Sequence, residues 1–305
     1  MSKGKWGESF LKSGLPLEYL TLMTFRSLGW HCDTHIEYER KNREGNSSWF
    51  ELDLMASYHK RNQDTELAFL VECKYHDLSR FWFFLPHIKS SWHFDDRVLN
   101  VGPLQTLAKP RNSTFLEFAP TSSGGIVVAE NGSKQDNAVC TAIQQLTNSF
   151  VPICMSTMFN YNIDFYNVRE GHDFQIYSTA LIPMVVTNAK IYRLKSTVTD
   201  IDIIRKAASP KEIADEIPWT WCYFDLPMSQ LNSNYVSINE HEKKEKELIC
   251  RYAQIKNSLS RFENRPNWVL ITSIINLQNV IETISNNFMK LPTIAINSVL
   301  RNHRR

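Results

Sequence analysis

Two neighbouring runs of the sequence carry residue types that together can hydrolyse a phosphate ester. Glu72 and Lys74 stand two residues apart at the end of an apolar run. Side chains two apart on a strand share a face, so the carboxylate and the ammonium group point the same way. Asp53 lies on the preceding run, which a short hairpin would place alongside. Adjacent strands are about 4.7–4.9 Å apart, so the two carboxylates can share one cation.

The expected cation is Mg²⁺ or Mn²⁺, because hard divalent ions prefer oxygen ligands and keep several waters. Asp53, Glu72, the backbone carbonyl of Cys73 and a phosphate oxygen would form its coordination shell. Lys74 would orient the attacking water or offset the charge that develops on the phosphate.

The alternative is that these are ordinary surface charges, with Glu72 and Lys74 paired on an edge strand and Asp53 on a solvated strand face. The apolar residues beside the pair indicate a buried strand instead: Ala68, Leu70 and Val71. Charges there are costly unless they are paired or bound to a metal, which favours a site.

A helix followed by three strands is expected to position these residues. Ser13–Gly29 has apolar residues at helical spacing, a proline near its start and a glycine at its end. His35–Lys41, Trp49–Ala56 and Leu67–Lys74 read as strands joined by polar turns. The order predicts an antiparallel meander.

The rest of the chain predicts further helices and strands, and therefore an α/β or α+β fold with a mixed sheet. No clear period is present from residue 77 to residue 118. The expected strands are Ile126–Ala129, Ile176–Asn188, Lys190–Leu194 (continuing the strand before it or pairing with it), Trp219–Leu226 and Trp268–Ile275. The expected helices are Asp136–Phe150, Ile201–Ala208, Lys211–Ile217, Glu240–Arg261 and Leu277–Phe288.

The text WFELDLMA followed by FLVECKY resembles the PD-(D/E)XK nuclease superfamily in its D…ExK form. The upstream segment LPLEYLTLMTFRSLGW is similar to the first helix of the resolvase-like and methyl-directed restriction branches, which carry a glutamate where Glu18 stands. AIQQLTNSF and IPMVVTNAKIY resemble a later helix and strand. The specific part covers about residues 15–75 and a weaker part extends to about 195. Leu52 occupies the place of the family's usual proline, and residues 77–118 have no counterpart in the minimal core.

The resemblance implies a restriction-endonuclease-like core over residues 1–196, an aromatic-rich insert at about 77–118, and a C-terminal α/β extension or subdomain over 197–305. It implies a metal-dependent endonuclease acting on DNA, in defence against foreign DNA or in DNA processing. Asp53, Glu72 and Lys74 would be catalytic. Glu18 would be an outer or second metal ligand, unless it only favours the positive start of its helix. Duplex cleavage by such a site predicts a homodimer or a partner subunit. The alternatives are a non-catalytic nucleic-acid- or partner-binding module and a nuclease subunit that needs a partner.

Composition says more about the cellular compartment expected for the protein than about its activity. A net charge of +2 neither indicates nor excludes nucleic acid as a partner. No apolar run reaches the ~18 residues of a membrane span. The six cysteines form no CxxC pair, which fits a reducing cytoplasm. The sequence has no GxxxxGK[ST] nucleotide-binding loop.

Several other residues have weaker functional interpretations. Gln144 or Gln145 would reach the site from the later helix, or simply be solvated. The aromatic group Phe81–Phe84, Trp92 and Phe94 would stack bases, or would form core or a subunit interface. Lys134 and the run Glu240–Glu247 are expected on the surface, and Arg301–Arg305 would contact phosphate or fray. His87 and His93 have no spacing typical of zinc ligands.

Overall fold

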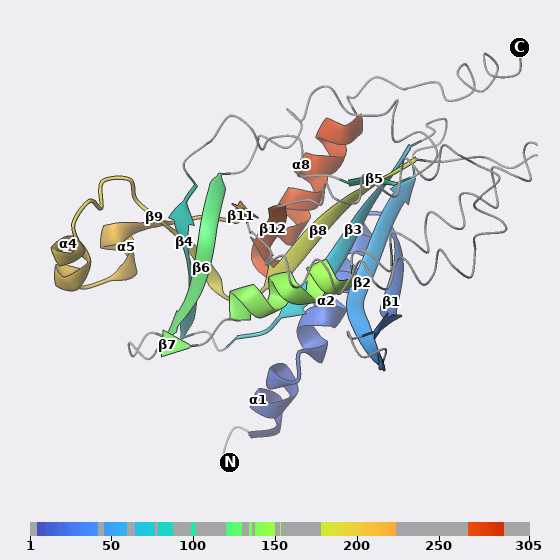
Figure 1. The fold of residues 1–305 in the computed structure, drawn as a ribbon, viewed down its shortest axis with the longest axis horizontal. Helices are drawn as coiled ribbons and strands as arrows, with labels where there is room; N and C mark the ends of the chain where they lie inside the picture. The colour runs from blue at the N-terminus through green and yellow to red at the C-terminus, as the bar shows by residue number, and fades with distance from the viewer. Residues whose placement is uncertain are drawn as a thin grey trace, which may run out of the picture.

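The computed structural model describes residues 5–41, 46–59, 65–76, 79–87, 99–101, 120–129, 134–135, 138–149, 153, 178–223 and 268–289. Within these ranges twelve strands form one mixed sheet (Figure 1). Its main path runs β1-β2-β3-β8-β12-β11-β6-β4-β9-β10, with β5 on β8 and β7 on β6. The expected α/β class with a mixed sheet is confirmed.

The N-terminal part contains the predicted helix followed by the predicted antiparallel meander, and a further helix, α1, precedes them. The elements are α1 (Lys5–Lys12), α2 (Leu15–Ser27), β1 (His31–Lys41), β2 (Ser47–His59) and β3 (Thr65–Lys74). α2 ends where the sequence predicts. Gly29 has a φ of 81°, and the amides of Gly29 and Trp30 donate to the carbonyls of Arg26 and Phe25. These two hydrogen bonds, with Gly29 in the left-handed conformation between them, form a Schellman motif that ends the helix.

A later helix and strand complete the sheet around β3. The helix spans residues 138–149, close to the predicted Asp136–Phe150. β8 (Ser178–Thr187) then pairs in parallel with β3 along its whole length, from Thr65↔Ser178 to Lys74↔Thr187. β3 therefore lies between β2 and β8, which explains why its side chains from Leu67 to Glu72 are buried.

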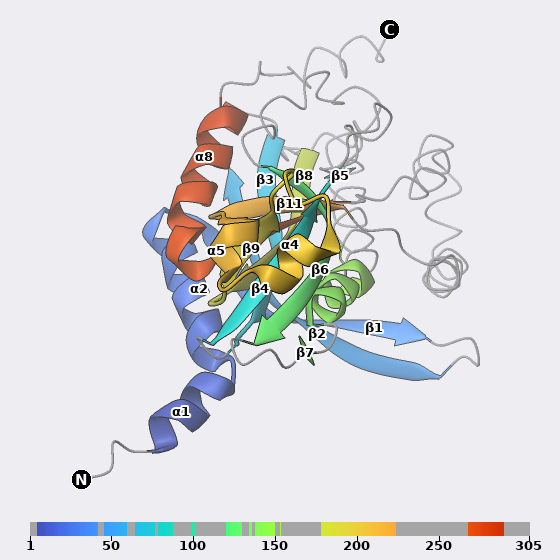
Figure 2. The same cartoon turned by 90° about the vertical axis from the view of Figure 1, so that its left-hand side faces the viewer.

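The sheet is covered on both faces. The helix over 138–149 contributes Val139, Ala142 and Leu146 to the core on one face. α2 and α8 (Leu277–Met289) pack on the other face, where Phe25 and Val280 meet the alternate side chains of β3. Figure 2 shows α2 and α8 together on one side of the sheet. No helix in the described ranges has both the length and the apolar character needed to cross a lipid bilayer.

The remaining strands extend the sheet beyond β8. They are β4 (Arg80–Pro86), β5 (Leu99–Val101), β6 (Thr121–Ala129), β7 (Lys134–Gln135), β9 (Lys190–Leu194), β10 (Ala214–Glu216), β11 (Trp219–Tyr223) and β12 (Trp268–Ser273). The short helices are α4 (Ile201–Lys206), α5 (Pro210–Ile213) and the 3₁₀ turn η4 (Ile274–Asn276). The predicted strands at 126, 219 and 268 and the helices at 201 and 277 are thus observed, within a few residues of their expected ends.

Two expectations in this part were wrong. Lys190–Leu194 neither continues β8 nor pairs with it, because β3 and β12 already occupy both edges of β8; β9 pairs with β4 and β10 instead. The helix expected over Lys211–Ile217 ends at Ile213, and residues 214–216 form an edge strand on β9. The stretch from residue 80 to 86, which has no clear period, is a strand whose aromatic residues lie on both faces. The predicted helix Glu240–Arg261 lies outside the described residues.

Candidate active site

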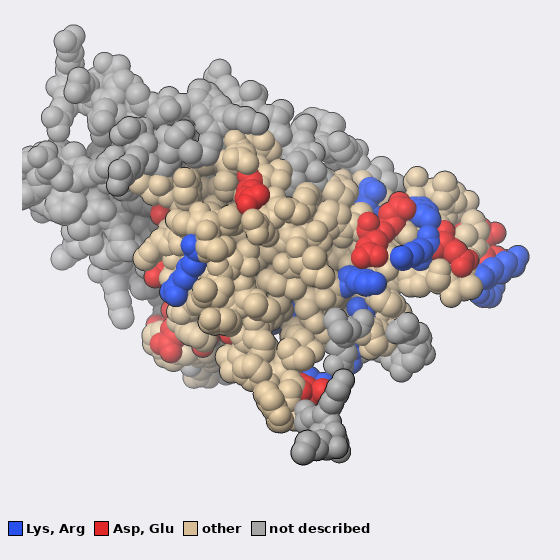
Figure 3. Space-filling view, turned by 180° about the vertical axis from the view of Figure 1, so that it is seen from behind, with Lys and Arg blue, Asp and Glu red and all other residues tan. Residues whose placement is uncertain are grey.

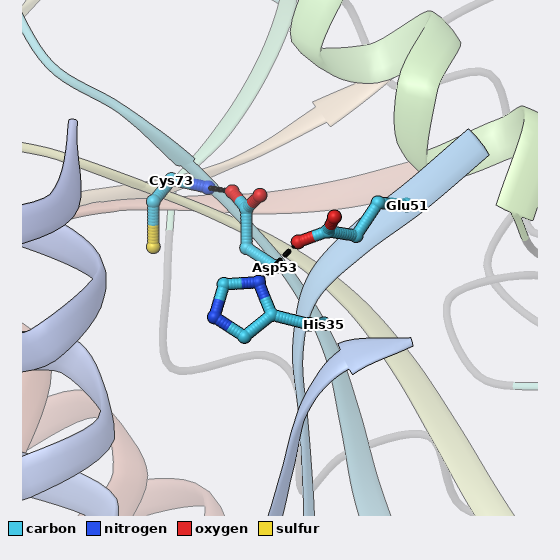
Figure 4. Close-up of polar contacts among 4 residues, drawn as sticks. All are labelled: His35, Glu51, Asp53 and Cys73. Atoms are coloured by element: carbon cyan, nitrogen blue, oxygen red, sulfur yellow. Dashed lines mark hydrogen bonds and ion pairs between the residues drawn. The ribbon is translucent and has the colours of Figure 1, made fainter. Parts of the chain in front are cut away.

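The site lies where β2 separates from β3. The β2–β3 ladder ends at the pair Leu54↔Val71, whereas β2 continues beside β1 as far as Lys41↔Ser47. Beyond the last pair, the Cys73 amide donates to the Asp53 side chain, with 2.6 Å between N and Oδ2 (Figure 4). The Asp53 carboxylate therefore takes the place of a backbone acceptor and is fixed next to β3.

Glu72 and Lys74 form an ion pair at the end of β3. Lys74 Nζ is 2.6 Å from Glu72 Oε1, and the two side chains are 23% and 2% exposed. The second oxygen, Oε2, is buried and has no hydrogen-bond partner among the described residues. A buried carboxylate oxygen without a partner is costly, and a cation ligated there would remove that cost.

Burial and mutual repulsion shift the acidity of both carboxylates. Burial, and then the charge of Asp53, raise the pKa of Glu72 to about 7, while Lys74 acts in the opposite direction. Burial also raises the pKa of Asp53, partly offset by the hydrogen bond from Cys73. Two carboxylates held near each other in a poorly solvated place favour a bound divalent cation.

Glu18 faces the same acidic group from α2. Burial raises its pKa, and the next cause is the charge of Asp53, which places the two carboxylates near each other. Gly14, which precedes α2 with a φ of 85°, leaves room for it: a Cβ there would be 3.2 Å from Glu18 Oε1. Glu18 is thus within electrostatic reach of the site, as the resemblance implies.

The residues present fit a cation with water-rich coordination better than one held by protein alone. In the described part of the chain, no three His, Cys, Asp or Glu side chains form a group that could hold a metal ion. Asp53 and Glu72 would be completed by the Cys73 carbonyl, waters and phosphate oxygens, which is the usual pattern for Mg²⁺. The Cys73 carbonyl remains a prediction. The Cys73 thiol faces Thr21 of α2, at 3.6 Å from its hydroxyl.

His35 and Glu51 are two residues that the sequence analysis missed. His35 has a φ of 54°, the only described non-glycine residue with positive φ. Its Nδ1 is hydrogen-bonded to Glu51, with the side chains 60% and 48% exposed (Figure 4). A left-handed residue of this kind costs about 1–2 kcal/mol, and an exposed ion pair returns at most about 1 kcal/mol. Stability alone does not account for this conformation.

Part of the signal for these residues was present in the sequence. Glu51 lies two before Asp53, so period two assigns both to one strand face. His35 could be found only with the hairpin register, which sets it opposite Asp53 between the pairs Thr34↔Leu54 and Ile36↔Leu52. Most of the polar turn predicted between these two strands, residues 42–45, lies outside the described residues.

None of the other predicted functional residues that the structure describes is observed to contact this site. Trp82 and Phe84 are buried core, and Phe81 and Phe83 pack against Tyr192; base stacking by these side chains is not supported. Gln144 is exposed, and Gln145, although it has a buried oxygen, makes no hydrogen bond to a site residue in the described part of the chain. Lys134 lies in β7 and His87 packs beside Trp268. Trp92, His93, Phe94, Glu240–Glu247 and Arg301–Arg305 lie outside the described residues.

Comparison with known protein families, curated proteins and solved structures gives no match. The geometry of the site therefore carries the functional argument.

Proposed function

We propose that the chain is a Mg²⁺- or Mn²⁺-dependent nuclease that hydrolyses phosphodiester bonds in DNA. Asp53 and Glu72 would hold the cation, and Lys74 would position the attacking water or stabilise the phosphate. The observation that carries the proposal is the Glu72 carboxylate: it is buried, paired on one oxygen with Lys74, and without a partner on the other.

Each side chain has a defined task in this reaction. Asp53 is oriented by the Cys73 amide and keeps its second oxygen for the cation. Glu72 supplies Oε2, and its other oxygen holds the Lys74 ammonium group at the edge of the acidic pair. Lys74 is the more exposed partner, so its ammonium group can reach a water or a phosphate oxygen. A bound cation would polarise the phosphoryl group and offset its negative charge.

The order of elements supports the same proposal. A helix, three antiparallel strands, a second helix and a strand parallel to the third appear in α2, β1, β2, β3, residues 138–149 and β8. This is the order expected of the restriction-endonuclease-like core that the sequence resembles. The support is an analogy at the level of fold, so function still depends on the site.

Cleavage assays test the proposal directly. Plasmid, linear duplex and single-stranded DNA are incubated with Mn²⁺ or Mg²⁺, with EDTA as a control. We expect Lys74→Ala to lower the rate by about 10²–10³-fold, the usual effect of removing a group that stabilises transition-state charge. Lys195→Ala is the matched control, because Lys195 is a partly buried lysine in β9–α4 that pairs with Asp215.

The outcomes separate the candidate functions. Cleavage that is lost with EDTA and with Lys74→Ala, but kept by Lys195→Ala, supports the nuclease. A folded wild-type protein that binds DNA without cutting it would instead be a binding module. Equal cleavage by Lys74→Ala and wild type would contradict the assigned site.

A nuclease subunit that acts with a partner is a second candidate, favoured by the exposed apolar side chains of the N-terminal helices. Trp6 is 77% exposed, Tyr19 60% and Leu20 52%. Ile275 of η4, which packs beside α2, is 84% exposed. The face that α2 and α8 cover carries few charged side chains, whereas charges of both signs gather over α4, α5 and β10 (Figure 3). Light scattering on the purified chain tests for self-association, and co-purification from the native host tests for another subunit.

A further inference from the structure

The β1–β2 ribbon reverses the direction of its side chains at the level of His35 and Asp53. Leu54 belongs to the core beside α2 and α8, whereas Leu52 belongs to the core beside the helix over residues 138–149. Residues two apart on a regular strand share a face, so the ribbon turns over between them. The turn coincides with the left-handed backbone of His35 on the neighbouring strand.

This turn sets the imidazole of His35 beside the acidic group. Its charge lowers the pKa of both Glu18 and Asp53, which places the ring within electrostatic reach of both carboxylates. Figure 4 shows His35, Glu51 and Asp53 pointing into the same space from β1 and β2. On β3, the ammonium group of Lys74 is paired with Glu72. Cationic groups therefore flank the acidic pair from two different strands.

Glu51 fixes the ring and leaves its outer nitrogen for a ligand. Nδ1 is bound to Glu51, and Nε2 makes no hydrogen bond to any described residue. The ring is largely exposed, so Nε2 can meet a ligand from solvent. The hydrogen bond and the charge of Glu51 raise the pKa of His35. They favour the protonated ring, in which Nδ1–H donates to Glu51 and Nε2–H is a second donor.

We propose that His35 is a substrate-contacting residue, whose Nε2–H donates to a non-bridging oxygen of a phosphodiester next to the Asp53–Glu72 pair, with Glu51 as its positioning residue. The inference rests on the proposed function, because it assumes a nucleic-acid strand at the site. It adds a phosphate contact on β1 to a site otherwise built from β2, β3 and α2. Strained backbone at a site is a reason to infer function when the strain itself is observed.

The experiment measures binding of fluorescein-labelled single-stranded and duplex DNA by anisotropy, with EDTA to prevent cleavage, alongside cleavage with Mn²⁺. The variants are His35→Gln, His35→Gly and Glu51→Gln. Glycine accepts a positive φ, so His35→Gly removes the imidazole while preserving the backbone. His31→Gln is the matched control, because His31 lies on the same strand, is exposed and pairs with Asp33 at 3.5 Å.

We expect His35→Gln and His35→Gly to bind DNA about tenfold more weakly than wild type, the usual effect of losing one charge-assisted hydrogen bond. The negative slope of log K against log salt should become shallower by about 0.7–0.9, the value for one phosphate contact. Glu51→Gln should show a smaller loss, and His31→Gln none. A merely structural role for His35 would leave the salt slope unchanged.

Binding and cleavage separate the two proposals. If wild type cleaves DNA and both His35 variants bind and cleave as it does, the inference is overturned and the nuclease stands. If wild type binds without cleaving and the His35 variants lose affinity and salt slope, the phosphate contact is supported and cleavage is not. A folded wild type that neither binds nor cleaves overturns both.

Discussion

Replacing Glu72 by glutamine should stabilise the metal-free protein at alkaline pH. Glu72 is buried beside Asp53, and its pKa is raised from 4.5 to about 7. Its charge therefore opposes folding once it ionises. Glutamine keeps the size and the polar atoms of the side chain but carries no charge at any pH, so it removes this penalty.

The magnitude follows from the two pKa values. The folded protein binds the proton more tightly than the unfolded chain, so stability is greatest below the unfolded pKa and is lost as pH rises through the folded one. The full shift corresponds to about 3 kcal/mol at pH 8, at about 1.4 kcal/mol per unit, and to less than about 1 kcal/mol at pH 5. Glu72→Gln should thus gain about 2.5 kcal/mol at pH 8 relative to its effect at pH 5.

Urea denaturation in EDTA at pH 5 and pH 8 measures this difference. Comparing the variant with wild type at both values cancels any effect of side-chain shape that is independent of pH. The ion pair with Lys74 does depend on pH, and its contribution is already contained in the pKa of Glu72. Glu282→Gln on α8 is the control, because Glu282 is exposed and lies on a different element from the site. A variant equally stable relative to wild type at both pH values would refute the argument that Glu72 is held in a costly charged state.

Three further predictions concern the surroundings of the site. Mg²⁺ or Mn²⁺ at millimolar concentration should raise the melting temperature of wild type at pH 8 but not of Asp53→Ala; an equal rise in both would remove Asp53 from the metal site. Gly14→Ala should lower the free energy of unfolding by about 1–2 kcal/mol, measured by urea denaturation, because an alanine at a φ of 85° is strained; unchanged stability would contradict this conformation. Asn188 bonds the amide and carbonyl of His76 at 2.7 and 2.6 Å, so Asn188→Ala should lose about 2 kcal/mol in the same assay. The exposed Asn286→Ala should not, and equal losses in these two variants would argue against the bridge.

Local patterning was enough to predict the strands that carry the site. Asp53 sits in an alternating run, and Glu72 and Lys74 follow an apolar one, so period two and a short turn predicted neighbouring strands. The observed register sets Leu54 against Val71 and brings the Asp53 side chain to the Cys73 amide. Glu18 could be associated with the site only through the family resemblance, because helical spacing alone fits a first-turn acid equally well.

Features that depend on distant parts of the chain could not be predicted. Lys190–Leu194 has the composition of a strand, but its partner depends on which edges of β8 are occupied. The backbone of His35 depends on where the ribbon turns over, and although histidine tolerates a positive φ better than most residues, its presence does not predict one at a given position. The sequence pattern after Ile213 is still helical, but residues 214–216 form a strand because an edge of β9 is available for pairing there. Tertiary pairing decided each of these.

The position of β8 has a consequence for how the protein is made. β8 pairs on one side with β3, which carries Glu72 and Lys74, and on the other with β12. During synthesis, the acidic site residues leave the ribosome long before β12, so β8 keeps an open edge in the nascent chain. Parallel pairing between distant segments is slow and leaves such edges exposed. The end of β3 that carries Glu72 and Lys74 is therefore expected to become rigid late, and chaperones that shield strand edges should raise the yield of folded protein.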